Sequence, residues 1–159
     1  MSFARIVLHT VWCTKYRDPW IDPVIEPALH DVIGHQFREQ GAKPIVIGGS
    51  YDHVHALHLL PRTKSMAKVM SAVKANTSRW MSLQHPRYRD FTWQDTYATF
   101  SVDYRHTDRL VRYIRNQRDH HTRREPYASY EEEFISLLKA YGFDNYDPKY
   151  LFPTRPRRA

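Results

Sequence analysis

The order of strand-like and helix-like segments leaves few folds open to this chain. Residues 5–14 are β-branched and aromatic, which predicts a central strand, and an apolar repeat at helical spacing up to Gly41 predicts a helix. Residues 44–48 and 53–60 predict a hairpin, a long helix capped by Ser65 follows, and residues 91–102 read as extended chain. This order predicts an α+β fold, a ferredoxin-like split βαβ sandwich whose antiparallel sheet is covered by helices on one face and open on the other.

Further helices follow the last predicted strand. Thr107 is the predicted cap of a helix that runs to about residue 122, is added to the sandwich and carries candidate site residues. Ser129 and Glu132 form a capping box that opens a last helix ending before Gly142. We expect one domain over residues 1–145 and an extended basic tail over 146–159, where three prolines and the run RPRR occur.

The charge and the cysteine content narrow the class of protein. The 159 residues hold 24 Lys and Arg against 17 Asp and Glu, a net charge of +7 that favours a polyanionic partner such as nucleic acid. The single cysteine, Cys13, excludes a disulfide framework or a multi-cysteine metal site and fits a reducing compartment. With no leader and no apolar run long enough for a bilayer, we expect a cytoplasmic protein that does not contact membranes.

Two pairs of residues have spacing that suits a catalytic site. His53 and His55 flank Val54 in a predicted strand, so both imidazoles project from one face with Cβ atoms roughly 6–7 Å apart. Two ring nitrogens could converge on one metal ion, although 10 histidines in the chain also produce such a pair by chance. Tyr113 and Gln117 stand at i and i+4 of a predicted helix and share one face, as many ordinary helix surfaces do. These spacings alone leave both interpretations open.

Taken together, the blocks of sequence resemble a known family. The segments GGSYDHVHALHLLP, VKANTSRW, FTWQDTYATFSV and VRYIRNQRDHH, followed by YEEEFISLLKAYGF, occur in this order. They resemble the single-tyrosine HUH transposases of the insertion-sequence-200-like group and the related REP-associated tyrosine transposases. The resemblance implies that His53, His55 and Gln117 are metal ligands and that Tyr113 is the nucleophile. It also implies a homodimer that acts on single-stranded DNA with a hairpin, with Tyr113 placed in cis or in trans.

The reaction that the resemblance implies is cleavage and rejoining of single-stranded DNA through a 5′-phosphotyrosine intermediate. Neutral imidazole and amide ligands leave a divalent ion its full charge, which suits a Lewis acid, and the absence of cysteine ligands favours Mg²⁺ or Mn²⁺ over structural zinc. A tyrosine with a reference pKa of about 10 is a weak nucleophile until it ionises, but its phenolate is a good leaving group. A covalent intermediate of this kind is reversible without ATP.

Several residues outside these pairs also carry predictions. Ala56 and His58 fall on the strand face opposite the histidine pair, and we expect His58 to be a structural histidine. Trp20, Trp93, Tyr97 and Phe100 could stack on unpaired bases, although the sequence favours core packing for each of them. The basic residues expected to contact DNA phosphates are Lys15, Arg17, Lys74, Arg79, Arg112 and Arg115.

Other functions compete with a transposase. The interpretation as a histidine-triad hydrolase is excluded, because Leu57 occupies the position where the next alternating histidine would be. A two-histidine phosphoesterase needs two strand-borne His-x-Thr/Ser motifs, and the single candidate, at residues 120–122, lies in a predicted helix. The remaining alternative is a module that binds single-stranded nucleic acid on the same sheet without chemistry.

Overall fold

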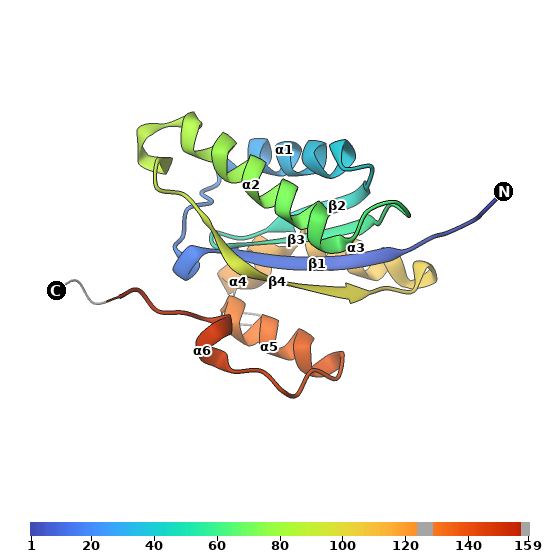
Figure 1. The fold of residues 1–159 in the computed structure, drawn as a ribbon. Coiled ribbons are helices and arrows are strands. Elements are labelled where there is room, and N and C mark those ends of the chain that lie inside the picture. Colours follow the sequence, from blue (N-terminus) through green and yellow to red (C-terminus); the bar gives the residue numbers. More distant parts are fainter. Residues whose placement is uncertain (124–128, 157–159) are drawn as a thin grey trace.

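A four-stranded antiparallel sheet with strand order β2-β3-β1-β4 forms the centre of the fold (Figure 1). The structure is a computed structural model that describes residues 1–123 and 129–156. The inner strands are β1 (Val7–Thr14) and β3 (His53–Leu59), and the edges are β2 (Lys43–Gly49) and β4 (Trp93–Ser101). The predicted α+β class and the central position of the first strand are confirmed.

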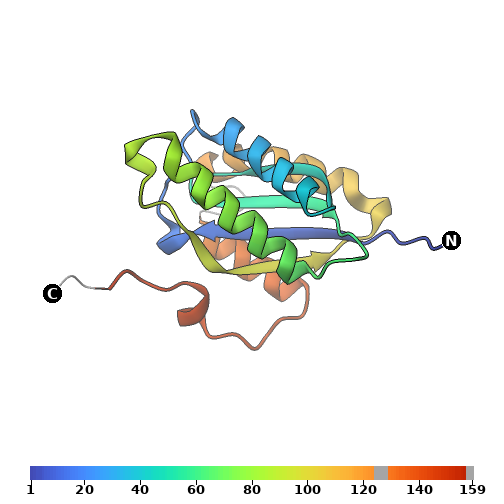
Figure 2. The same cartoon turned by 45° about the horizontal axis from the view of Figure 1, so that its top comes forward.

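Two helices cover one face of the sheet. The helices α1 (Glu26–Glu39) and α2 (Met66–Gln84) lie in front of the strands in Figure 2. Trp12 and Val54 point from the sheet into the same buried cluster as Phe37 of α1 and Val73 of α2. Because side chains alternate along a strand, this face takes the even-numbered residues of β1 and β3 and leaves the odd-numbered ones for the other face.

Helices also cover the second face, which we expected to be open. The helices α3 (Thr107–Arg115), α4 (Gln117–Arg123) and α5 (Tyr130–Ala140) follow the last strand, and Figure 1 shows α5 on the side away from α1 and α2. Ile114 of α3 packs with Leu57, and Phe134 of α5 packs with Val11. The expectation of an open face is therefore wrong, because the apolar odd-numbered residues of the strands are buried under these added helices.

The predicted helix from Thr107 to about residue 122 is broken in two. α3 ends at Arg115, Asn116 has φ −96° and ψ 12°, and α4 begins at Gln117. Thr107 is the first helical residue rather than the cap, since its hydroxyl donates to the Tyr104 carbonyl. By contrast, the predicted caps form elsewhere, because the side chains of Ser65 and Ser129 accept hydrogen bonds from backbone amides three residues later.

The tail is less extended than we expected. A short helix, α6 (Pro148–Leu151), interrupts it, and Leu151 and Phe152 pack against the cluster that contains Phe134 of α5. The guanidinium of Arg155 pairs with Asp18 at the end of the sheet. Residues 157–159 of the expected basic tail lie outside the described residues. Among the described helices, none has the length and apolar character needed to cross a lipid bilayer.

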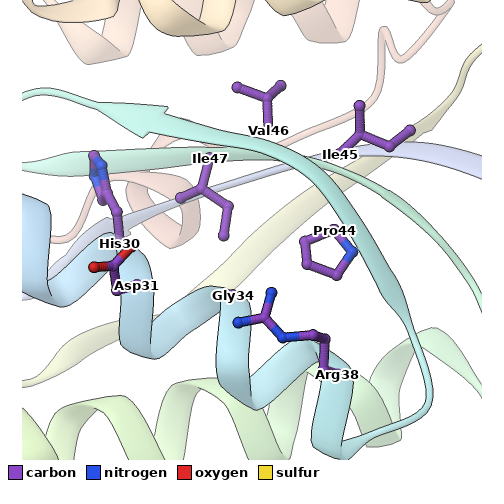
Figure 3. A pocket seen from close by; sticks show the side chains of 8 residues that line it. All are labelled: His30, Asp31, Gly34, Arg38, Pro44, Ile45, Val46 and Ile47. Carbon is purple, nitrogen blue, oxygen red and sulfur yellow. The ribbon is translucent and has the colours of Figure 1, made fainter.

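A hollow of about 230 Å³ separates α1 from the edge strand β2 (Figure 3). His30, Asp31 and Arg38 of α1 line it together with residues 44–47 of β2. Figure 3 shows the Arg38 side chain running along α1 on the side that faces Pro44. This hollow belongs to the face of the sheet that α1 covers, so it is not part of the site described next, which lies on the other face.

Candidate functional site

Strand β3 places His53 and His55 side by side on the second face of the sheet. Both side chains are fully buried, and their rings lie 5.2 Å apart between centroids. His53 pairs in register with Cys13, and His55 pairs with Val11 of the central strand. The rigid centre of the sheet therefore fixes the spacing of the two imidazoles, as the alternation of side chains predicts.

The Nδ1 atom of each of these two histidines already has a hydrogen-bonding partner. His53 Nδ1 lies 2.6 Å from the Asp52 carboxylate, and His55 Nδ1 lies 2.8 Å from His9 Nε2. Burial acts to lower the pKa of His53, but the hydrogen bond and the charge of Asp52 outweigh it and raise that pKa above its ordinary value. Burial lowers the pKa of His55, which favours its neutral form. Contacts of this kind orient histidines whose other nitrogen binds a metal.

Tyr113 and Gln117 reach the histidine pair of their own chain. Gln117 Oε1 lies 3.2 Å from His53 Nε2, and the Tyr113 ring stands edge-on to the His55 ring at 6.0 Å between centroids. Although the helix breaks at Asn116, the i, i+4 spacing still directs both side chains to one point. The four residues singled out in the sequence are thus brought together within one chain.

Close packing of α3 on β2 makes this approach possible. A Cβ atom added at Gly48 would lie 2.1 Å from the carbonyl oxygen of Ile114, the residue after Tyr113. A glycine at this point of β2 therefore lets the helix backbone lie directly against the strand. The position of Tyr113 therefore depends on the absence of a side chain at Gly48.

A buried glutamate that the sequence did not reveal lies at the centre of the cluster. Glu133 of α5 has 0% exposure and accepts hydrogen bonds from the Tyr113 hydroxyl and, at 2.9 Å, from Gln117 Nε2. Its other oxygen lies 2.8 Å from His121 Nε2. Burial acts to raise the pKa of Glu133, but the surrounding histidines hold it well below the ordinary value. One signal was available, since Glu133 directly precedes Phe134 in the buried stripe of α5.

The donor atoms of the cluster fit a divalent cation. Ligand atoms of His53, His121 and Glu133 all lie within 4.8 Å of one another. His55 Nε2 is buried, lacks a hydrogen-bond partner among the described residues, and stands 3.3 Å from a Glu133 oxygen without the alignment of a hydrogen bond. Two imidazole nitrogens beside one carboxylate, with the Gln117 amide oxygen next to His53 Nε2, are a donor set that a divalent ion can use.

A cavity of about 400 Å³ opens on the other side of Tyr113. Val102, Leu110 and Tyr141 line it, and Arg109 is also part of its wall. The tyrosine thus stands between a buried polar cluster and a cavity with aromatic and aliphatic walls. Such walls can accept a planar apolar group beside the tyrosine.

Four of the six predicted DNA contacts lie on elements that adjoin the cluster. Arg112 and Arg115 are exposed on α3, and Lys15 is exposed at the end of β1. The guanidinium of Arg17 already takes part in an ion pair, since its Nε lies 2.6 Å from the Glu131 carboxylate of α5. Among the described residues, no ion pair involves Arg112 or Arg115, so both guanidinium groups of α3 are available for a further contact.

The other two predicted contacts lie on α2, across the sheet from Tyr113. The Lys74 ammonium donates to the backbone carbonyls of Gln94 and Asp95, which ties α2 to β4. Arg79 is exposed on the same helix. The structure does not bring these two residues to the side of the molecule that carries the cluster.

The aromatic residues named as possible stacking partners are mostly internal. Trp93 and Phe100 are buried, and Trp93 Nε1 donates to the Thr77 hydroxyl within the core. Tyr97 and Trp20 pack against the same core and are partly exposed. His58, expected to be structural, is fully buried and lies 2.9 Å from the Thr10 hydroxyl.

A comparison of the chain with known protein families identifies the class of protein to which this fold and this cluster belong. A family profile described as "Transposase IS200 like" matches residues 2–117, which is most of the chain. The chain belongs to this family of transposases. The match includes the histidine pair, Tyr113 and Gln117 and ends before α5.

Two solved structures share the fold. A candidate transposase from Deinococcus radiodurans R1 is 21% identical with a TM-score of 0.57, over 74% of this chain and 94% of that one. A REP-associated tyrosine transposase bound to a REP hairpin is 15% identical with a TM-score of 0.53, over 72% of this chain and 70% of the other. No functionally curated protein matches the chain.

Proposed function

We propose that this transposase cleaves and rejoins single-stranded DNA through a 5′-phosphotyrosine bond to Tyr113. The observation that carries the proposal is the shared position of Tyr113 and Gln117, whose side chains both donate to Glu133 beside His53 and His55. A hydroxyl fixed beside convergent imidazole nitrogens is the arrangement that nucleophilic attack on a metal-polarised phosphate requires.

The chemistry balances without an energy source. The Tyr113 oxygen loses its proton and forms a bond to phosphorus, the bond from phosphorus to the 3′-oxygen breaks, and that oxygen takes up a proton. One phosphodiester replaces another, so a free 3′-hydroxyl can later attack the phosphotyrosine and release Tyr113. The protein's task is to hold the hydroxyl in line with the phosphate, and the close packing of α3 against β2 supports this role because it fixes the backbone next to Tyr113.

His53, His55 and Gln117 would hold a divalent metal in this proposal. The ion would supply Lewis-acid polarisation of a phosphate oxygen. The amide oxygen suits Mg²⁺ or Mn²⁺, the two imidazole nitrogens favour Mn²⁺ over Mg²⁺, and no thiolate is present to favour structural zinc. Asp52 and His9 hold the Nδ1 atoms of the two imidazoles, which keeps both Nε2 atoms directed at the site.

The proposed path for DNA follows α3. Arg112 and Arg115 are exposed on the helix that carries Tyr113 and can pair with phosphates on either side of the one attacked. The cavity beside Tyr113 has room for an unpaired base next to that phosphate, with Tyr141 as a stacking surface. Lys15 extends the positive surface at the end of β1, whereas Lys74 and Arg79 lie outside this path.

The proposed substrate is single-stranded DNA with a hairpin, and the proposed working form is a cytoplasmic homodimer. A solved structure of similar fold is a tyrosine transposase bound to a REP hairpin. Because Tyr113 lies against the histidines of its own chain, each subunit of such a dimer carries a full set of the proposed catalytic residues.

Trapping of a covalent adduct tests this proposal. Single-stranded hairpin DNA labelled on its 3′ side is incubated with the protein and Mn²⁺, and denaturing electrophoresis separates free from protein-bound label. The wild type should retain the label, and Tyr113→Phe should not. Replacing both His53 and His55 by Ala should abolish the adduct but leave salt-sensitive DNA binding. DNA binding without an adduct in the wild type would instead identify a non-catalytic binding module.

A further inference from the structure

Glu133 is the one buried acidic side chain among the described residues, and it comes from outside the part of the chain that matches the family profile. The profile ends at residue 117, whereas Glu133 belongs to α5. The helix α5 therefore adds a negative charge to a cluster whose members within the matched residues, His53, His55 and Gln117, are neutral as ligands. This addition changes what the cluster can bind.

The surroundings of Glu133 are those of a ligand rather than of a structural ion pair. A buried carboxylate is costly unless a cation or several donors compensate it. Among residues 1–123 and 129–156, no lysine or arginine pairs with Glu133, and the nitrogen atoms within ion-pair distance of its carboxylate belong to three histidines. Its remaining partners, Tyr113 and Gln117, are proposed members of the same site.

The distances suit one coordination shell. Ligand atoms that bind one small divalent ion at about 2.0–2.2 Å lie roughly 3–4 Å from one another. The two Glu133 oxygens lie 3.3 Å from His55 Nε2 and 3.5 Å from His53 Nε2. The carboxylate thus needs little movement to share an ion with both imidazoles.

We propose that Glu133 is an anionic ligand of the metal ion, an inference that rests on the proposed function. A carboxylate added to neutral ligands lowers the net charge of the filled site from +2 to +1 and supplies a hard oxygen donor, which Mg²⁺ and Mn²⁺ prefer. The metal then binds more tightly than the neutral set alone allows. His121 holds the second carboxylate oxygen and acts as a positioning residue.

This ligand also links metal binding to the nucleophile. The Glu133 oxygen that accepts from Tyr113 is the one next to His55. A cation on that oxygen competes with the hydrogen bond from the tyrosine hydroxyl. Metal binding therefore frees the hydroxyl that the carboxylate otherwise holds, and removal of the hydroxyl leaves the carboxylate more available to metal.

Titration of the full-length protein with Mn²⁺ in the absence of DNA tests the inference. Free Mn²⁺ is followed by electron paramagnetic resonance for the wild type and for Glu133→Gln, which keeps the shape and removes the charge. The control is Glu132→Gln, which removes a charge from an exposed neighbouring position of α5. We expect the Mn²⁺ dissociation constant to rise by at least about tenfold in Glu133→Gln and to stay within twofold of the wild type in Glu132→Gln.

Two more variants keep the test decisive if Glu133→Gln does not fold. Tyr113→Phe should bind Mn²⁺ at least as tightly as the wild type, and Glu133→Asp, which keeps the charge on a shorter side chain, should bind it more weakly. An unchanged Mn²⁺ affinity in Glu133→Gln or Glu133→Asp, or a weaker affinity in Tyr113→Phe, would overturn the role of Glu133 and leave the proposed function standing. A wild type that does not bind Mn²⁺ would overturn both.

Discussion

Replacement of Gly48 by alanine should displace the nucleophile without touching any catalytic residue. The new Cβ would lie 2.1 Å from the carbonyl oxygen of Ile114 and 2.9 Å from its carbonyl carbon, where contacts below 3.0 Å essentially do not occur. Both partners are backbone, so β2 and α3 must separate by about 1 Å. Because Tyr113 precedes Ile114, its hydroxyl moves with the helix.

The expected effect on catalysis is larger than the effect on stability. Overpacking of this kind costs about 1–3 kcal/mol of unfolding free energy, which corresponds to roughly 2–4 °C in Tm per kcal/mol for a domain of this size. A misplacement of about 1 Å in a reacting group can slow a reaction by about 100-fold. We therefore expect a folded Gly48→Ala protein whose rate of covalent adduct formation falls by about two orders of magnitude.

The assay is the rate of adduct formation on hairpin DNA, measured beside thermal unfolding. Gly34→Ala is the matched control, since the same methyl group in α1 would meet Ile47 Cδ1 at an ordinary 3.4 Å on the other face of the sheet. This control should form adduct at the wild-type rate. If Gly48→Ala also kept a rate within twofold of the wild type, the docking of α3 on β2 would not be what positions Tyr113.

Three further predictions concern the metal, the pH and the DNA. Asp52→Asn removes the anionic partner of His53 and should weaken Mn²⁺ binding by about 10–100-fold; an unchanged dissociation constant would contradict the orienting role of Asp52. Burial lowers the pKa of His58 to about 4, so the unfolded chain binds an extra proton between pH of about 6.5 and 4 and stability falls as pH drops through that window. His58→Gln should flatten this dependence by up to about 1.4 kcal/mol per pH unit in urea unfolding, and parallel pH profiles would show that the histidine does not titrate in this way. Arg112→Ala should lower the slope of log affinity against log salt by about one, whereas Arg79→Ala, on α2, should not; equal effects would place DNA on both faces.

The sequence was most informative where local geometry decides the outcome. Alternation along a strand puts His53 and His55 on one face regardless of what surrounds it, and i, i+4 spacing survives even the break at Asn116. The order of segments likewise led to the antiparallel sheet with a central first strand. These inferences need only short-range periodicity.

Long-range packing was out of reach. The covering of the second face depends on how α3 to α5 fold back over the sheet, which no local pattern specifies. Glu133 and His121 are far from the histidine pair in sequence. For the same reason, the sequence could not predict that both residues lie beside that pair. The sequence resemblance gave roles to Tyr113 and Gln117, and although it includes residues 130–143, it gave no role to Glu133 of α5.

Mass mapping of the protein–DNA junction tests the role of Tyr113 most directly. Cleavage before aspartate isolates residues 108–118, DRLVRYIRNQR, a peptide with a single tyrosine. After incubation with single-stranded hairpin DNA and Mn²⁺, and after nuclease digestion, this peptide should carry a nucleotide joined through its 5′-phosphate to Tyr113. A junction at another residue, or one made through a 3′-phosphate, would contradict the proposed mechanism.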